Sequence, residues 1–255
     1  MTASNIPQLV AHRGFMQHYP ENSWSALEAA LQAGACWLEF DVQMCADGRF
    51  ILLHDADFMR TAGNPQSVFD ADLNTLQSIS VHEPERLGEQ FAPQPAPALD
   101  RVLQRLARYP EARAMVEIKD ESLDQWKLPT VMDGLLKILA PFRDQCILIA
   151  YSDAAIEYTQ QHSDLDTGWV LRHYDQSHHE RATALAPQFL ICNERKIPDG
   201  EHPWPGDWQW MLYDICDPQR ALHWAQRGVA LIETGDIGAM LQHPQLATRA
   251  CRHDL

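Results

Sequence analysis

Short apolar runs alternate with segments of helical period along almost the whole chain, and this alternation limits the possible folds more than any other feature. It is typical of a parallel α/β protein, in which each strand is followed by a helix that covers the sheet. The expected strands lie near residues 8–12, 36–44, 113–119, 145–151, 167–172, 188–192, 208–215 and 229–234. The expected helices lie near residues 22–33, 99–109, 129–141, 153–162, 177–186 and 217–227, and a short one begins near 236.

Two segments interrupt the alternation. Asp47-Gly48 predicts a tight turn from the second strand into an antiparallel extension over residues 49–54, and the turn-rich residues 56–98 then predict a small insertion. Residues 193–207 hold proline turns and no helical period, so we expect the helix there to be missing or vestigial. A chain of 255 residues, 45% of them hydrophobic, has the usual length of one domain, and we expect a single domain over residues 1–255.

The charge of the chain excludes some partners. A formal net charge of −15 without a basic stripe predicts no nucleic-acid partner and no stable association with an anionic membrane. Residues 1–7 lack the features of a secretory signal, and no apolar run approaches the roughly 20 residues of a membrane-spanning helix. We therefore expect a cytoplasmic protein whose cysteines, at positions 36, 45, 146, 192, 216 and 251, stay reduced.

Imidazole and charged side chains stand where the first expected strands end. His12 and Arg13 follow the first strand, and His54 follows the antiparallel extension. Polar groups at the ends of successive strands are typical of an active site at the mouth of an α/β fold. Arg13 would supply positive charge for an anionic substrate, and the two histidines would exchange protons near neutral pH.

Carboxylates occupy two of the strands that follow. Glu39 and Asp41 are two residues apart and therefore share one face of the second strand, while Glu117 and Lys119 end the third. Three carboxylates at one rim suit one hard divalent cation, Mg²⁺ or Ca²⁺, better than zinc, because the cysteines form no C-x-x-C pair. Lys119 would be a second positive charge for an anion, or it would form only an ion pair with Glu117. A cation, two proton-transfer groups and two positive side chains are the parts needed to cleave a phosphodiester.

At these residues the chain resembles the glycerophosphodiester phosphodiesterase family. The ordered set is specific although no single motif is. The matching motifs are His12-Arg13-Gly14, Pro20-Glu21-Asn22, Gly34-Ala35, Glu39-Phe40-Asp41-Val42, Asp47-Gly48, His54-Asp55 and Glu117-Ile118-Lys119. The resemblance is continuous to about Lys119 and returns weakly over residues 228–234.

The resemblance implies a (β/α)8 TIM barrel with a small insertion after the second strand. It also implies metal-dependent hydrolysis of small-molecule glycerophosphodiesters to glycerol 3-phosphate and an alcohol. The residue roles it implies are acid/base catalysis by His12 and His54, phosphate binding by Arg13 and Lys119, and metal binding by Glu39, Asp41 and Glu117. Departures from the family pattern, such as Cys216 in place of a usual Asn, affect substrate specificity more than chemistry.

Two other functions compete with this interpretation. A lysophospholipase D would use the same catalytic parts with an apolar entrance for an acyl chain, which the insertion could provide through Phe58, Met59, Val68, Phe69 and Leu73. A barrel that binds a phosphate ligand without turnover is disfavoured, since a binder needs no proton-transfer pair.

Four smaller features keep two interpretations each. Glu21 and Asn22 serve the ligand or only open the first helix, and Glu233 and Asp236 form a site edge or, as we favour, only a turn. His18 contacts substrate or lies at the surface, and Trp204, Trp208 and Trp210 form a binding wall or, as we favour, part of the core.

Overall fold

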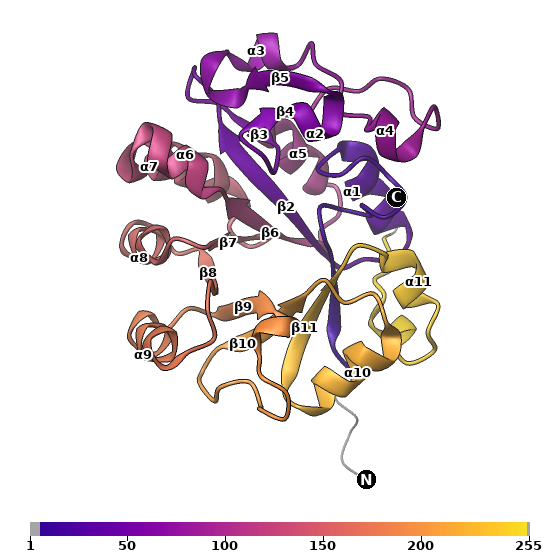
Figure 1. Cartoon of the computed structure of the whole chain (residues 1–255), viewed down its shortest axis with the longest axis vertical. Helices are drawn as coiled ribbons and strands as arrows, with labels where there is room; N and C mark the ends of the chain where they lie inside the picture. The colour runs from indigo at the N-terminus through magenta and orange to yellow at the C-terminus, as the bar shows by residue number, and fades with distance from the viewer. Residues whose placement is uncertain (1–5, 254–255) are drawn as a thin grey trace.

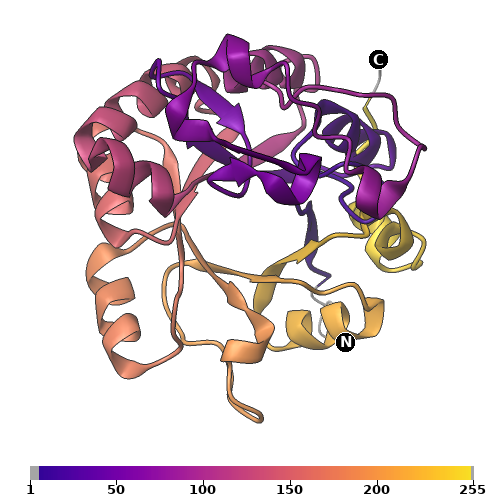
Figure 2. The ribbon, with the colours of Figure 1, turned by 45° about the horizontal axis from the view of Figure 1, so that its top comes forward.

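A computed structural model describes residues 6–253. It contains a closed barrel of eight parallel strands, whose arrangement is shown in Figures 1 and 2. Strand β1 pairs with both β2 and β11, which closes the ring, and each remaining strand pairs with its neighbours. The predicted (β/α)8 barrel is therefore confirmed. The barrel strands are β1 (Gln8–Ala11), β2 (Trp37–Met44), β6 (Arg113–Ile118), β7 (Cys146–Ala150), β8 (Asp166–Val170), β9 (Phe189–Asn193), β10 (Gln209–Tyr213) and β11 (Val229–Thr234).

The helices surround the barrel and follow its strands in the expected order (Figure 2). Side chains cap several of them; Ser23, for example, accepts a bond from the backbone N–H of Ala26. The helices are α1 (Trp24–Gln32), α5 (Leu99–Leu106), α6 (Asp120–Trp126), α7 (Leu128–Leu139), α8 (Asp153–His162), α9 (Gln176–Leu185), α10 (Pro218–Gln226) and α11 (Ile237–Leu241). None of the helices within residues 6–253 has the length and apolar character needed to cross a bilayer.

Two details of the helix prediction differ in outcome. Between β9 and β10, where every residue is described, the chain forms only the short 3-10 helix η3 (Glu194–Lys196), so the missing sixth helix is confirmed. Helix α6, directly after Lys119, was not predicted. Its polar sequence has no clear apolar stripe, and tertiary packing of Leu123 and Ser122 under the neighbouring elements stabilises it instead.

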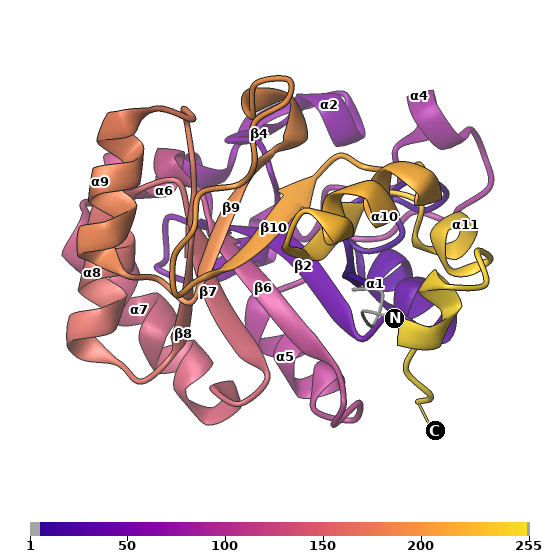
Figure 3. The ribbon, with the colours of Figure 1, turned by 90° about the horizontal axis from the view of Figure 1, so that it is seen from below.

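The insertion follows β2 as predicted. Strand β3 (Phe50–Leu52) runs antiparallel to β2, and residues beyond it form a small unit with a separate apolar core made by Phe58, Val68, Leu73 and Leu76. The insertion and the loop after β9 lie at the same end of the barrel (Figure 3). The unit comprises β4 (Asp57–Phe58), α2 (Met59–Ala62), β5 (Asn64–Ser67), η1 (Val68–Asp70), α3 (Leu73–Leu76) and α4 (Pro84–Leu87).

Apolar side chains fill the interior of the barrel below the mouth. They form one buried cluster that includes Val10, Met115, Phe189 and Met211. The cluster is packed so tightly that a methyl group on Gly168 would lie 2.9 Å from Ile149, 3.0 Å from Ile191 and 3.2 Å from Phe189. The barrel is therefore a solid support for the groups above it, as in other barrels of eight parallel strands.

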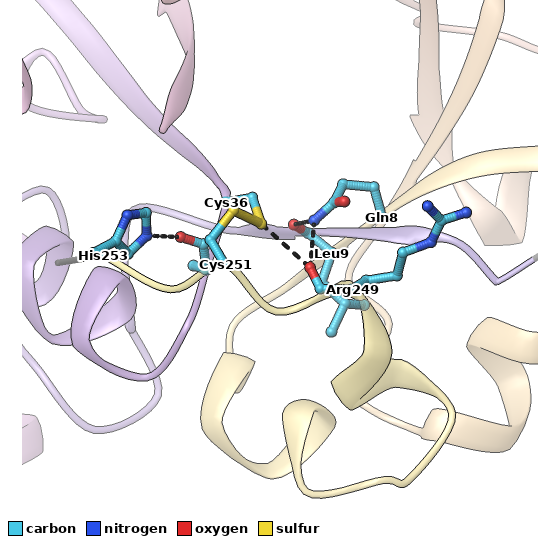
Figure 4. The surroundings of a disulfide bond; sticks show 7 residues. Gln8, Leu9, Cys36, Arg249, Cys251 and His253 are labelled. Atoms are coloured by element: carbon cyan, nitrogen blue, oxygen red, sulfur yellow. Dashed lines mark hydrogen bonds between the residues drawn. A yellow bond between two sulfur atoms is a disulfide. The ribbon is translucent and has the colours of Figure 1, made fainter. Parts of the chain in front are cut away.

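A disulfide contradicts one expectation. Cys36, just before β2, is bonded to Cys251 in the C-terminal tail, with Cα atoms 5.2 Å apart (Figure 4). The prediction of six reduced cysteines is wrong for this pair and holds for the other four cysteines, all within the described residues. The pairing was missed because 215 residues separate the partners, and only closure of the barrel brings the tail beside residue 34, whose carbonyl accepts the Cys251 N–H.

Candidate active site

His12 and Arg13 follow β1 at the barrel mouth. The His12 ring is largely buried, and its Nε2 atom lies 3.9 Å from carboxylate oxygens of both Glu39 and Glu233. Arg13 adopts a left-handed backbone conformation (φ 51°), which turns its N–H toward Glu39 at 3.0 Å. Its guanidinium binds Glu21 at 2.9 Å and approaches Asp41 at 3.2 Å. Burial, with the charge of Arg13, lowers the pKa of His12 to about 3, so the imidazole is neutral at neutral pH.

Asp41 and Glu117 are directly paired in the parallel register of β2 and β6. Lys119 lies between them, with its Nζ atom 2.7 Å from Glu117 and 3.3 Å from Asp41. Asn22 holds Asp41 from the other side, donating to its carboxylate at 2.9 Å and accepting its backbone N–H at 3.1 Å. Asn22 therefore supports the site directly, and Ser23 rather than Asn22 caps the first helix.

The electrostatics of these carboxylates differ. Burial opposes ionisation of Asp41, but Lys119 and Arg13 outweigh it and hold the pKa of this carboxyl well below its usual range. Burial raises the pKa of Glu117 to about 7, with Lys119 opposing the shift and Asp41 adding to it. For Glu39, nearby positive charge does not offset the cost of burial: burial and the charge of Asp41 raise its pKa well above the usual range.

These carboxylates suit a hard cation. One oxygen from each of Glu39, Asp41 and Glu117 can be chosen so that the three lie within 4.8 Å of one another. The Oε1 atom of Glu39 is buried and has no hydrogen-bond partner within residues 6–253. A buried carboxylate oxygen without a donor and an all-oxygen set of ligands fit Mg²⁺ or Ca²⁺.

His54 lies at the junction between the barrel and the insertion, between β3 and β4. Its Nδ1 atom is 2.6 Å from Asp55, which in turn accepts a bond from Arg60 at 2.8 Å. Both terminal nitrogens of Arg60 donate to Glu21 at 2.7 Å. Glu21 therefore joins Arg60 to Arg13, and it has a structural role beyond the opening of the first helix.

Glu233 was interpreted as a site edge or a turn, and the favoured interpretation, the turn, is wrong. Its side chain, on the last strand β11, is buried at the barrel mouth, and His12, Glu39 and Glu233 form a second group of potential ligands. Burial and the charges of Glu117 and Asp214 raise the pKa of Glu233 well above its usual range. Its position in β11, paired with Val10 of β1, was the available signal, because inward positions of adjacent strands alternate together.

All seven residues predicted for the site line one cavity of about 230 Å³. Tyr151 and Tyr213 also line it, and their hydroxyls are 2.8 Å apart. The lining residues from the prediction are His12, Arg13, Glu39, Asp41, His54, Glu117 and Lys119.

Other candidate residues lie outside this cavity. The His18 side chain is 59% exposed and approaches Asp236. Trp204 stacks on Tyr174 with ring centres 4.0 Å apart, and Trp210 is buried, so these tryptophans pack the region beside α9 rather than the cavity. Cys216 is exposed, and the Thr234 hydroxyl lies 3.4 Å from its sulfur.

An eight-stranded barrel with buried carboxylates, two histidines and two positive side chains at its mouth defines a TIM-barrel protein with a polar, charged centre. Residues 12–185 match the model of the glycerophosphoryl diester phosphodiesterase family. The match covers more than half of the chain, and the protein belongs to this family.

Curated relatives and solved structures agree with this membership. A glycerophosphodiester phosphodiesterase of Caldanaerobacter subterraneus is 32% identical over 96 residues, 38% of this chain and 39% of that protein. One of Bacillus altitudinis is 32% identical over 115 residues, 45% of this chain and 46% of that protein. The chain thus aligns with less than half the length of these relatives.

The structural matches extend over nearly the whole barrel. A phosphodiesterase of Oleispira antarctica, solved with sn-glycerol-3-phosphate, superposes with a TM-score of 0.80 at 19% identity, covering 93% of this chain and 96% of that one. A putative glycerophosphoryl diester phosphodiesterase of Silicibacter pomeroyi gives 0.80 at 18% identity, covering 99% and 97%. At these identities the likeness concerns the fold.

Proposed function

We propose that this protein hydrolyses glycerophosphodiesters to glycerol 3-phosphate and an alcohol. The observation that carries the proposal is the cavity that His12 and His54 share with three carboxylates and two positive side chains. Family membership, and the product bound to the Oleispira antarctica neighbour, support the same substrate class. We also propose that residues 1–255 act as one domain.

One divalent cation, Mg²⁺ or Ca²⁺, would be held by Glu39, Asp41 and Glu117 in this proposal. When bound, it would withdraw charge from the phosphoryl oxygens and assist ionisation of an attacking hydroxyl. Arg13 and Lys119 would bind the remaining phosphoryl oxygens, for which their positions beside Asp41 are suited.

The two histidines would divide the proton transfers. His12 is neutral and can accept the proton of the attacking hydroxyl. The Nδ1–H group of His54 donates a hydrogen bond to Asp55, because an ionised carboxylate can only accept, and in the imidazolium form the Nε2–H group would be free to protonate the leaving oxygen. Each proton then has a defined acceptor or donor on this chain.

The lysophospholipase D alternative has less structural support. Of the five residues named for an apolar entrance, Phe58, Val68 and Leu73 are fully buried in the core of the insertion, and Phe69 is partly buried against it. Met59 is 51% exposed and stands alone among the large apolar side chains of residues 6–253. A single exposed methionine does not make a surface for an acyl chain.

Release of glycerol 3-phosphate from glycerophosphocholine and glycerophosphoglycerol tests the proposal, with lysophosphatidylcholine as the competing substrate. We expect turnover of the first two compounds that disappears with a chelator and returns with Mg²⁺ or Ca²⁺. Lack of turnover of any glycerophosphodiester by the metal-loaded protein would overturn the function, and faster turnover of lysophosphatidylcholine would restore the alternative.

The cytoplasm remains our proposed compartment, and the Cys36–Cys251 bond weighs against it, because disulfides persist mainly in oxidising compartments. Alkylation of free thiols at the moment of cell lysis, followed by mass spectrometry, separates the cases. Alkylated Cys36 and Cys251 would support the cytoplasm, whereas an intact bond would support an oxidising compartment.

A further inference from the structure

We propose that Arg60, which the insertion supplies, positions the imidazole of His54 through Asp55 and so contributes to turnover without contact with the substrate. The inference rests on the proposed function, since His54 has a catalytic role only within it. Arg60 lies in α2 and is not among the residues that line the catalytic cavity, although it borders an adjoining pocket that His54 and Arg13 also line. The contacts that join Arg60 to the reacting groups pass through Asp55 and Glu21.

The contacts from Arg60 to His54 are short and continuous. The Nε atom of Arg60 donates to Oδ2 of Asp55 at 2.8 Å, and Oδ1 of Asp55 lies 2.6 Å from Nδ1 of His54. Each oxygen of Asp55 therefore has one partner, and the carboxylate cannot rotate without loss of one of them. Because Asp55 accepts the Nδ1 proton, its fixed orientation also fixes the ring and leaves Nε2 facing the cavity.

A second carboxylate holds the other end of Arg60. Its Nη1 and Nη2 atoms donate to the two oxygens of Glu21 at 2.7 Å each, a bidentate arrangement that fixes the plane of the guanidinium. Glu21 is buried and also binds Arg13 at 2.9 Å. The partly exposed Arg60 is thus held from both sides, and it connects the proton-transfer side of the cavity with the phosphate side.

Attachment of the insertion to the barrel does not require Arg60. Arg86, a second arginine of the insertion, donates to the carbonyls of Met16 and Tyr19 at 2.7 and 2.8 Å and binds Glu83. These contacts join the insertion to the loop after β1 without reaching His54 or Asp55. Arg86 is therefore a matched control, since it is an arginine of the same unit with the same charge and has no hydrogen bond to Asp55 or His54.

We call the contacts from Arg60 through Asp55 to His54 the relay. Steady-state kinetics of the metal-loaded protein test it. Arg60→Lys keeps the charge and the pairing with Glu21 but cannot bind both carboxylates in one plane. We expect Arg60→Lys and Arg60→Met to lower kcat by about 10–100-fold, the effect usual for a misplaced reacting group. Guanidinium ion in the assay should restore part of the loss in Arg60→Met. Arg86→Met should lower the melting temperature and keep kcat within twofold.

A double mutant shows whether the effect passes through Asp55. If it does, Arg60→Met should lower kcat less than twofold in an Asp55→Asn background, whereas independent effects would multiply. Multiplying effects, or kcat within twofold of wild type in both Arg60 variants, would overturn the proposal.

A readout without turnover separates this proposal from the proposed function. In long-range ¹H–¹⁵N spectra recorded at a pH high enough for the histidine rings to be neutral, we expect His54 to be the Nδ1–H tautomer in the wild type and a mixture of tautomers in Arg60→Met. An unchanged tautomer in that variant would overturn the relay whatever the enzyme does. The expected change in a protein that hydrolyses no glycerophosphodiester would leave the relay standing and refute the function.

Discussion

Replacement of Lys119 by Met should expose how the site balances its charge. The Nζ atom of Lys119 lies 2.7 Å from Glu117 and 3.3 Å from Asp41, and all three side chains are buried. Loss of one partner from a buried ion pair costs about 3–5 kcal/mol, because the remaining charge stays desolvated. Arg13 still approaches Asp41 at 3.2 Å, so the loss falls mainly on Glu117.

This loss translates into a measurable melting shift. An unfolding entropy of about 2.1 cal/mol/K per residue gives a chain of 255 residues about 0.5 kcal/mol per degree, so Lys119→Met should melt about 6–9 °C lower in a chelator. A bound divalent cation would supply the missing positive charge, so saturating Mg²⁺ or Ca²⁺ should stabilise the variant more than the wild type.

Calorimetric melting with and without cation checks this prediction, and Lys196→Met is the control. Lys196 also lies at the mouth, but its Nζ atom donates to the Leu171 carbonyl and faces tyrosine rings rather than carboxylates. Its melting shift should not depend on the cation. An equal shift in Lys119→Met with and without cation would refute the shared carboxylate centre. A stability loss at unchanged kcat/KM would mean that Lys119 is only structural.

Three further predictions address other parts of the molecule. His12→Ala and His54→Ala should each lower kcat about 10²–10⁴-fold at nearly unchanged melting temperature, and the double mutant should be little worse than the poorer single one. Glu233→Gln should raise the melting temperature of the cation-free protein at neutral pH. A carboxyl whose folded pKa is raised destabilises the fold above its unfolded pKa, and the gain should vanish in melting scans below about pH 4.3. Serine at Cys36 and Cys251 should lower the free energy of unfolding by about 2–5 kcal/mol, measured by denaturant titration, without a change in kcat.

Much of the barrel could be predicted because its signals are local. Strand and helix periods, a turn such as Asp47-Gly48 and a cap such as Ser23 are read within a few residues, and helix α8 was placed at its observed bounds, Asp153–His162. The site residues in the predicted motifs line one cavity, because parallel strands bring their carboxyl ends to one rim.

The missed features depend on positions far apart in sequence. Glu233 lies opposite His12 only because β11 closes the ring on β1, and Cys251 reaches Cys36 only through the same closure. Arg60 lies in the turn-rich insertion, where the sequence predicted no catalytic residue, and its proposed role requires Glu21 from the loop after β1 and Asp55 from the barrel rim together. Local patterns predict elements and their ends well, but they do not predict which loop side chains meet.

The balance of charge at the mouth leads to one more prediction, about the order of binding. Five carboxyl groups face Arg13 and Lys119 in this cavity. Even if Glu39 and Glu233, whose pKa values are raised well above the usual range, are protonated and Glu117, with a pKa of about 7, is only partly ionised, the remaining negative charge at least balances the two positive charges. The cavity without a cation therefore offers a phosphate dianion no net attraction.

A bound divalent cation would make the net charge of the cavity positive, so we expect glycerol 3-phosphate to bind only to the cation-loaded protein. At about 5 Å and an effective dielectric constant of about 20, each added unit of positive charge attracts a unit negative charge by about 3 kcal/mol, or more than 100-fold in affinity. Isothermal titration of glycerol 3-phosphate into the chelator-treated and Ca²⁺-loaded protein measures this difference, with His18→Ala, outside the cavity, as a control that should match the wild type. Equal affinity in the two states would show that Arg13 and Lys119 hold the phosphate without a cation, and that the carboxylates serve another purpose.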